Sequence, residues 1–187
     1  MGVTYGTVTN AAKFKPGGRE TGSARPFGAG SLPGMPAVLD LWEKTSRLPQ
    51  GKRIFSIAFA RKAPYFATIR PRFVDIRPNH AELVIPKRRA VHNHIGTVHA
   101  IALCNGLEAA MGALAEATIP PDKRWIPKGM EVAYTAKADS DVTCVAETDP
   151  EQWTGDDPDL PVRVRGVRRD GEVVIEGVIR LWVTPKR

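Results

Sequence analysis

Paired cysteines, long apolar runs and aromatic side chains are all scarce in this sequence. The two cysteines, Cys104 and Cys144, lie far apart and match neither a metal motif nor a disulfide framework, so we expect a cytoplasmic protein. No stretch approaches the roughly 18 apolar residues that span a bilayer, and the N-terminus lacks the apolar core of a secretion signal. Aromatic residues make up 7% of the chain and form no base-stacking motif. These absences argue against membrane and nucleic-acid partners.

The overall composition is that of an ordinary globular protein. The 187 residues fit one domain, and 42% of them are hydrophobic, which is enough for a proper core. The formal net charge of +7 results from 27 Lys and Arg against 20 Asp and Glu. Such a charge favours an anionic partner, whether nucleic acid, acidic lipid or a phosphorylated ligand such as a coenzyme. The charge alone does not choose among these partners.

The first part of the chain differs from the rest in composition. Residues 1–35 hold eight of the seventeen glycines and show little apolar periodicity. We therefore predict a flexible Gly- and Pro-rich arm at 1–35, followed by one folded domain at 36–187.

Strand patterns dominate the predicted domain. A first helix is predicted at 36–48, where Pro36 suits an initial helical turn. Seven β-strands are predicted, at 54–60, 65–76, 81–89, 129–138, 141–148, 160–169 and 172–185. Pro71 implies a bulge or an edge position in its strand, and Asp170-Gly171 predicts a hairpin.

One long helix is predicted in the body of the chain, at 100–117. It is apolar nearly all round, so the sheet has to wrap it or cover it on both sides. The turns after it are short, which favours antiparallel pairing over repeated βαβ units. The predicted class is therefore α+β, with an antiparallel sheet around one long central helix.

Three of the four histidines lie directly before this helix, in HNHIGTVHAIALCNGLE at 92–108. A single acid, Glu108, lies among Ala, Gly, Leu and Ile. Because an unpaired buried carboxylate is costly, Glu108 is a candidate functional residue, although a Glu on a helix is usually a solvated surface residue. The spacing of His92, His94 and His99 matches no common zinc motif, so no metal is expected.

The order of elements, and above all GTVHAIALCNGLEAA at 96–110, resembles the hotdog-fold thioesterases of the phenylacetate-degradation type. In that family an Asn precedes a His-Gly-Gly turn, and an Asp or Glu follows nine residues after the His on the central helix. The matching positions here are Asn93, His99 and Glu108, with Gly96 and Thr97 also in register. The chain resembles still more closely an uncharacterised hotdog subfamily with the signature NHxGTxHAxAL…E. The resemblance implies a hotdog fold over the predicted domain.

The resemblance also implies hydrolysis of an acyl-CoA or a related small-molecule thioester. Glu108 would activate water as a general base or attack directly as a nucleophile. His99 and Asn93 are expected to position substrate or water, although a helix cap and a turn are their alternative roles. No cofactor is expected, because coenzyme A enters as part of the substrate.

Free backbone amides at a helix start can hold the oxyanion that develops on a thioester carbonyl. Ala100 and Ile101 supply the candidate amides, with Gly96 and Thr97 as further substrate contacts. Ala100-Ile101 replaces the Gly-Gly of the family, and the loss of these glycines alters how closely a ligand approaches the backbone.

The spacing of His99 and Glu108 bears on the number of subunits. Unless His99 lies in a non-helical cap, nine residues at about 100° each put the two on opposite sides of one helix, where they cannot face the same pocket within one subunit. They face one pocket if Glu108 of one copy meets the helix start of another, so we expect a homodimer or a dimer of dimers.

Basic residues beside the predicted strands are candidates for binding the phosphates of coenzyme A. Lys87, Arg88, Arg89 and Lys128 are the main candidates, and Arg61, Arg70 and Arg72 also flank the strands. A protein that binds acyl-CoA or a carrier-borne thioester without chemistry is the alternative function. A hotdog hydratase is a third reading, but the Asp and His motif typical of hydratases is not found.

Overall fold

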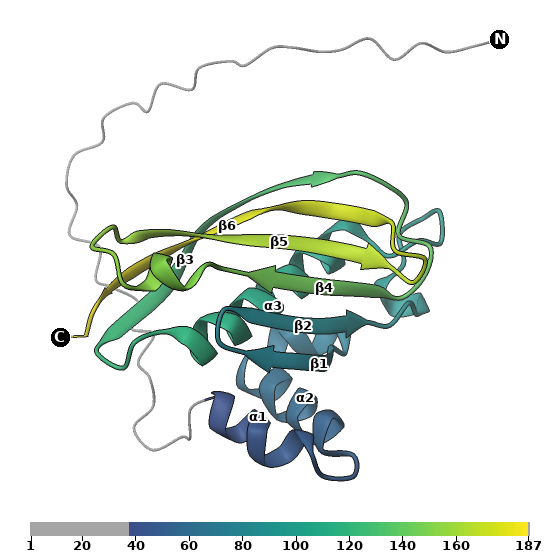
Figure 1. Cartoon of the computed structure of the whole chain (residues 1–187). Coiled ribbons are helices and arrows are strands. Elements are labelled where there is room, and N and C mark those ends of the chain that lie inside the picture. The colour runs from purple at the N-terminus through teal and green to yellow at the C-terminus, as the bar shows by residue number, and fades with distance from the viewer. Residues whose placement is uncertain (1–37, 187) are drawn as a thin grey trace, which may run out of the picture. The chain divides into compact units, whose positions relative to one another are not determined.

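The N-terminal part of the domain is helical. The structure is a computed structural model that describes residues 38–186, so the predicted arm at 1–35 lies outside the described residues. Helix α1 (Val38–Ser46) begins close to the predicted start, and α2 (Gly51–Lys62) and the 3-10 helix η1 (Pro64–Ile69) follow. The three elements lie beside the first strands of the sheet and one end of the central helix (Figure 1).

The strand predicted at 54–60 is wrong, because these residues form most of α2. Helical spacing places Phe55 and Phe59 on one face, where both pack against Phe73 at ring distances of 5.4 and 4.7 Å. Ile54 and Ile57 point away from this aromatic cluster and are exposed. The buried side chains therefore follow a helical period that the short apolar run did not reveal.

In the described part of the chain, six antiparallel strands form a single sheet. They are β1 (Arg72–Arg77), β2 (His80–Ile85), β3 (Lys123–Tyr134), β4 (Val142–Glu147), β5 (Asp159–Arg168) and β6 (Val173–Pro185). Their order in the sheet is β1-β2-β4-β5-β6-β3, so β1 and β3 are the edge strands.

Two turn predictions are confirmed. Pro71 directly precedes the edge strand β1, whose register with β2 shifts between Phe73 and Asp75. The Asp170-Gly171 turn joins β5 to β6, with Gly171 at φ 92° and its N–H donating to the Arg168 carbonyl at 3.0 Å. Residues 65–69, predicted as strand, instead form most of η1, and its C-cap Arg70 has a left-handed backbone (φ 48°).

The central helix α3 (Ala100–Thr118) runs along one face of the sheet (Figure 1). Leu107, Ala110 and Leu114 are fully buried against the strands. The helix is long and apolar enough to cross a membrane, but 67% of its most apolar window is buried inside this domain. It is the core helix that the sequence predicts, and the architecture is α+β with the sheet curved around one long helix.

Candidate active site

The start of α3 is shaped by His99, which is the helix N-cap. Its backbone is extended (φ −64°, ψ 141°), and its Nδ1 accepts a hydrogen bond from the Ile101 N–H at 3.1 Å. The N–H of Ala100 has no hydrogen-bond partner within residues 38–186. Of the two predicted oxyanion amides, Ala100 is therefore free to bind a ligand, whereas Ile101 is already paired.

Asn93 organises the loop that leads to this cap. Its Oδ1 accepts from the N–H groups of Ile95 and Thr97, both at 3.1 Å, and its Nδ2 donates to the Thr97 Oγ1 at 2.8 Å. Gly96 has φ 79°, a left-handed conformation that favours glycine. The structure thus brings Asn93, Gly96 and Thr97 together as a hydrogen-bonded turn, in which Asn93 holds the loop rather than projecting freely from it.

Glu108 lies half-buried on the side of α3 that faces β3. One turn before it, Cys104 Sγ lies 3.3 Å from the Tyr134 hydroxyl of β3. One turn after it, a Cβ at Gly112 would lie 3.7 Å from the Trp125 ring of β3. Glu108 therefore sits between two contacts to the same edge strand, and its carboxylate has no hydrogen bond or ion pair within the part of the chain that the structure describes.

Large apolar and aromatic side chains are exposed on α3 and β3, the two elements beside this carboxylate. Ile101 is 55% exposed two turns before Glu108, and Tyr134 is 53% exposed on β3. The hydrogen bond to Cys104 raises the pKa of Tyr134 above its ordinary value, with burial acting in the same direction, so its hydroxyl stays protonated. At 1.5 Å per residue, Glu108 lies roughly 13 Å along the axis from His99. His99 is a cap outside the helix, so helical spacing does not fix the side of α3 on which its imidazole lies. One chain alone does not bring the two groups together.

The four histidines do not gather into one site. His92 has a buried Nε2 without a hydrogen-bond partner in the described chain, and His94 is exposed. His80 lies on β2, with its Nδ1 3.5 Å from Glu147 and its Nε2 3.8 Å from Asp75. Within residues 38–186 no group of three His, Cys, Asp or Glu side chains is placed to hold a metal ion.

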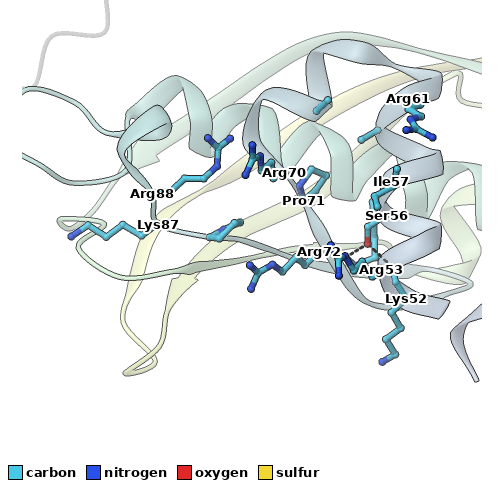
Figure 2. Close-up of a pocket in the computed structure, with 14 residues that line it drawn as sticks. Lys52, Arg53, Ser56, Ile57, Arg61, Arg70, Pro71, Arg72, Lys87 and Arg88 are labelled. Atoms are coloured by element: carbon cyan, nitrogen blue, oxygen red, sulfur yellow. Dashed lines mark hydrogen bonds between the residues drawn. The ribbon is translucent and has the colours of Figure 1, made fainter. Parts of the chain in front are cut away.

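A basic cavity of about 1070 Å³ opens beside α2, η1 and β1 (Figure 2). Seven cationic side chains line it: Lys52, Arg53, Arg61, Arg70, Arg72, Lys87 and Arg88. Of the four main phosphate-binding candidates, Lys87 and Arg88 line this cavity. Arg89 is exposed and does not line it, and Lys128 lies on β3 with its Nζ 3.9 Å from the centre of the Trp182 ring.

The sequence did not single out Lys52 and Arg53 as ligand contacts, because residues 54–60 were interpreted as a strand rather than a helix. Cys104 and Tyr134 were also missed as neighbours of Glu108. The helical spacing of four residues from Glu108 is the signal that points to Cys104.

The 3-10 helix η1 separates the basic cavity from α3. Arg88 Nη2 donates to the Thr68 carbonyl, and Asn105 Nδ2 donates to the Thr68 Oγ1 at 3.2 Å and to the Tyr65 carbonyl at 3.3 Å. Asn105 lies on α3 one turn before Glu108. The chain of contacts from Arg88 through Thr68 to Asn105 therefore joins the cavity wall to the helix that carries the carboxylate.

A curved antiparallel sheet around one long helix, with an unpaired carboxylate on that helix and a capped loop at its start, defines a hotdog-fold protein. The chain belongs to the family described as a domain of unknown function, DUF4442, whose model matches residues 51–183. No curated protein matches the chain.

Solved structures share this fold. A structural-genomics target is 42% identical, and the match covers 80% of this chain and 99% of the target chain, with a TM-score of 0.71. A Pseudomonas aeruginosa protein of unknown function, described as a probable thioesterase, is 22% identical over 74% of this chain and 97% of its own (TM-score 0.64). A thioesterase family protein from Silicibacter pomeroyi is 20% identical, and the match covers 70% of this chain and 99% of the Silicibacter chain, with a TM-score of 0.57. The predicted resemblance to hotdog-fold thioesterases is thus confirmed at the level of the fold.

Proposed function

We propose that this protein is a cytoplasmic acyl-CoA thioesterase in which Glu108 activates the attacking water. The observation that carries the proposal is the unpaired, half-buried carboxylate of Glu108 on the core helix. The other acid of this helix, Glu116, accepts a hydrogen bond from Trp125 Nε1 at 3.0 Å. Burial of a charged group without a partner is costly, so its retention there favours a chemical role. The thioesterase descriptions of two structures with the same fold support the same class of reaction.

In the proposed reaction, Glu108 takes a proton from water while the water oxygen attacks the thioester carbonyl carbon. Negative charge develops on the carbonyl oxygen, and the free N–H of Ala100 at the positive end of the α3 dipole stabilises it. The C–S bond then breaks, and the proton passes from Glu108 to the leaving thiolate. The products are a carboxylic acid and the thiol of coenzyme A.

His99 and Asn93 act as positioning residues in this scheme. His99 caps α3 through Nδ1 and fixes the orientation of the first turn, and Asn93 holds the loop that precedes it. Both therefore act on the Ala100 amide rather than on the substrate.

The proposed site needs a second copy of the chain, because the Ala100 amide lies at the start of α3, about 12 Å along the helix axis from Glu108. The surface next to Glu108 suits such an interface. It combines the exposed side chains of Ile101 and Tyr134 with the outer edge of β3, which has no neighbouring strand among the described residues. Pairing of two copies there would place each Glu108 against the partner's helix start.

The substitution Glu108→Gln tests the proposal. It keeps the shape of the side chain and removes its basicity, so we expect kcat to fall by about 100-fold or more. Thiol release from short, long and aromatic acyl-CoAs measures the loss, and gel filtration checks that the assembly is unchanged. Glu43→Gln, an exposed acid on α1, is the matched control and should keep full activity. Full activity of Glu108→Gln on every acyl-CoA that the wild type hydrolyses would refute the assignment.

A non-catalytic acyl-CoA binder is the second candidate function, favoured by the cap that occupies the Ile101 amide. With one amide paired, the oxyanion hole has fewer free donors than a helix start can offer. Thermal stabilisation by acyl-CoA without any thiol release from the wild type would support this alternative.

A further inference from the structure

We propose that the basic cavity between α2, η1, β1 and residues 86–88 binds the phosphorylated nucleotide part of coenzyme A. The identity of the ligand rests on the proposed function. The shape and charge of the cavity stand on their own.

The charge of the cavity is unbalanced. Its seven cationic side chains come from three separate segments, and none of its described lining residues is Asp or Glu. Within residues 38–186, none of the seven forms an ion pair with an acid. Uncompensated like charges repel each other, so this concentration of cations is stabilised when an anion binds. The nucleotide of coenzyme A carries a diphosphate and a 3′-phosphate, which together match such a site.

Arg88 and Arg70 lie on the same side of the cavity, away from Lys52 and Arg53 (Figure 2). Partial burial of Arg88, followed by the charge of Arg70, lowers the pKa of the Arg88 guanidinium. Its Nε is buried and has no hydrogen-bond partner in the described chain, although Nη2 is held by the Thr68 carbonyl. Guanidinium N–H groups without partners are suited to a phosphate, whose oxygens accept two parallel hydrogen bonds.

Apolar groups line the cavity between the cations. Ala60 and Phe73 belong to the buried core, and Pro71 and Pro86 are also buried. The hydroxyl of Ser56 donates to the Lys52 carbonyl and accepts from the Phe73 N–H, so it is not free for a ligand. An apolar floor with a cationic rim suits a ligand that has both a flat ring system and phosphates, as a nucleotide does.

A second observation connects the cavity to Glu108. Asn105 on α3 is 5% exposed, and its Oδ1 is buried without a partner in the described residues. The same side chain donates to η1, whose Thr68 carbonyl is bonded by Arg88. The pantetheine arm of coenzyme A contains two amide N–H groups, which are donors of the kind that this oxygen lacks. The contacts from Arg88 through η1 to Asn105 place the cavity wall next to the helix that carries Glu108.

Binding of adenosine 3′,5′-bisphosphate to the full chain tests the cavity directly. The variant Arg53→Gln/Arg61→Gln/Arg70→Asn removes three cations, and Asn suits the left-handed backbone of position 70. We expect its affinity, measured by calorimetry, to fall about 10-fold or more. The control Lys44→Gln/Arg47→Gln/Lys137→Gln removes three exposed cations elsewhere and should bind within about twofold of the wild type. Equal losses in the two variants, or no binding to the wild type, would overturn the proposal.

Kinetics of thioester hydrolysis distinguish a failure of the cavity assignment from a failure of the proposed thioesterase activity. The cavity variant should raise KM for acyl-CoA and leave kcat/KM for the matching acyl-pantetheine, which lacks the nucleotide, unchanged. If the wild type hydrolyses no thioester but only the cavity variant loses bisphosphate binding, the proposed function fails and the cavity assignment stands. If the cavity variant instead loses activity on a carrier-protein thioester and keeps it on acyl-CoA, the nucleotide assignment is wrong.

Discussion

The absence of a side chain at Gly177 sets the distance between β6 and β3. A Cβ at this position would lie 2.0 Å from the Glu131 carbonyl oxygen and 2.8 Å from the Val132 Cα. Both are backbone atoms of the neighbouring strand, which cannot rotate away as the end of a flexible side chain can. Position 177 is therefore glycine because of packing, without any need for an unusual backbone angle.

Gly177→Ala should lower the free energy of unfolding by about 1–3 kcal/mol, because the two strands must separate to admit the methyl group. Chemical denaturation measures the change. Gly155→Ala is the matched control, since nothing lies within 4 Å of a Cβ built there, and it should leave stability unchanged or slightly raised. Equal stability of both variants would show that the strands adjust without cost.

The sequence predicts the positions of some candidate site residues but not the contacts that they make. Glu108 was identified by an acid in an apolar helix, and the structure places it half-buried beside β3. Asn93 was predicted to lie near the helix start, but hydrogen bonds within its own turn could not be read from spacing. The basic cavity could not be predicted as a unit, because its cations come from segments up to thirty-six positions apart, Lys52 to Arg88.

Among the secondary-structure elements, long and strongly patterned segments were predictable and short ones were not. The central helix and the four strands after it were predicted, although β3 begins at Lys123, ahead of the predicted start at 129. Residues 54–60 were misread because seven mostly apolar residues fit both a strand and a helix. The tertiary contact of Phe55 with Trp42, at a ring distance of 5.1 Å, helps to fix the helix, and no local pattern contains that contact.

Three neighbouring strands share an ionic cluster made of His80 on β2, Glu147 on β4 and Arg165 on β5. Arg165 Nη1 donates to Glu147 Oε2 at 2.5 Å. This hydrogen bond, assisted by the charges of Arg165 and His80, lowers the pKa of Glu147 below its ordinary value. A carboxyl whose pKa is lower in the folded state than in the unfolded state stabilises the fold above the unfolded pKa and loses that contribution as the pH falls.

Glu147→Gln should therefore reduce stability at pH 7 by about 0.5–1 kcal/mol, the size of a partly exposed ion pair. The deficit should shrink as the pH falls below the ordinary pKa of a glutamate carboxyl and disappear once the wild-type carboxyl is protonated in the folded state. Thermal unfolding of both proteins from pH 3 to pH 8 measures the difference, with Glu43→Gln as the control. A deficit that stays constant over this range would mean that packing, rather than charge, is responsible.

For the assembled molecule, the central question is which chain supplies which catalytic group. Ala100→Pro removes the proposed oxyanion N–H at a helix position that tolerates proline, and His99 already has the extended backbone that proline requires. We expect Ala100→Pro and Glu108→Gln each to be inactive alone. Mixed and reassembled in equal amounts, they should regain about a quarter of wild-type activity, because half of the dimers would contain one intact site of two.

Thiol release after mixing, with mass spectrometry to show that subunits have exchanged, provides the measurement. Exchange without any recovered activity would mean that both groups act within one chain.

The position of β3 at the end of the sheet has a consequence for synthesis of the protein. Within the described chain its only neighbour is β6, which leaves the ribosome after every other described element. A nascent chain halted before Val173 would leave both edges of β3 and one edge of β5 bare. Such edges attach readily to other unfinished chains, so we expect truncated products to depend on chaperones for as long as β6 is missing.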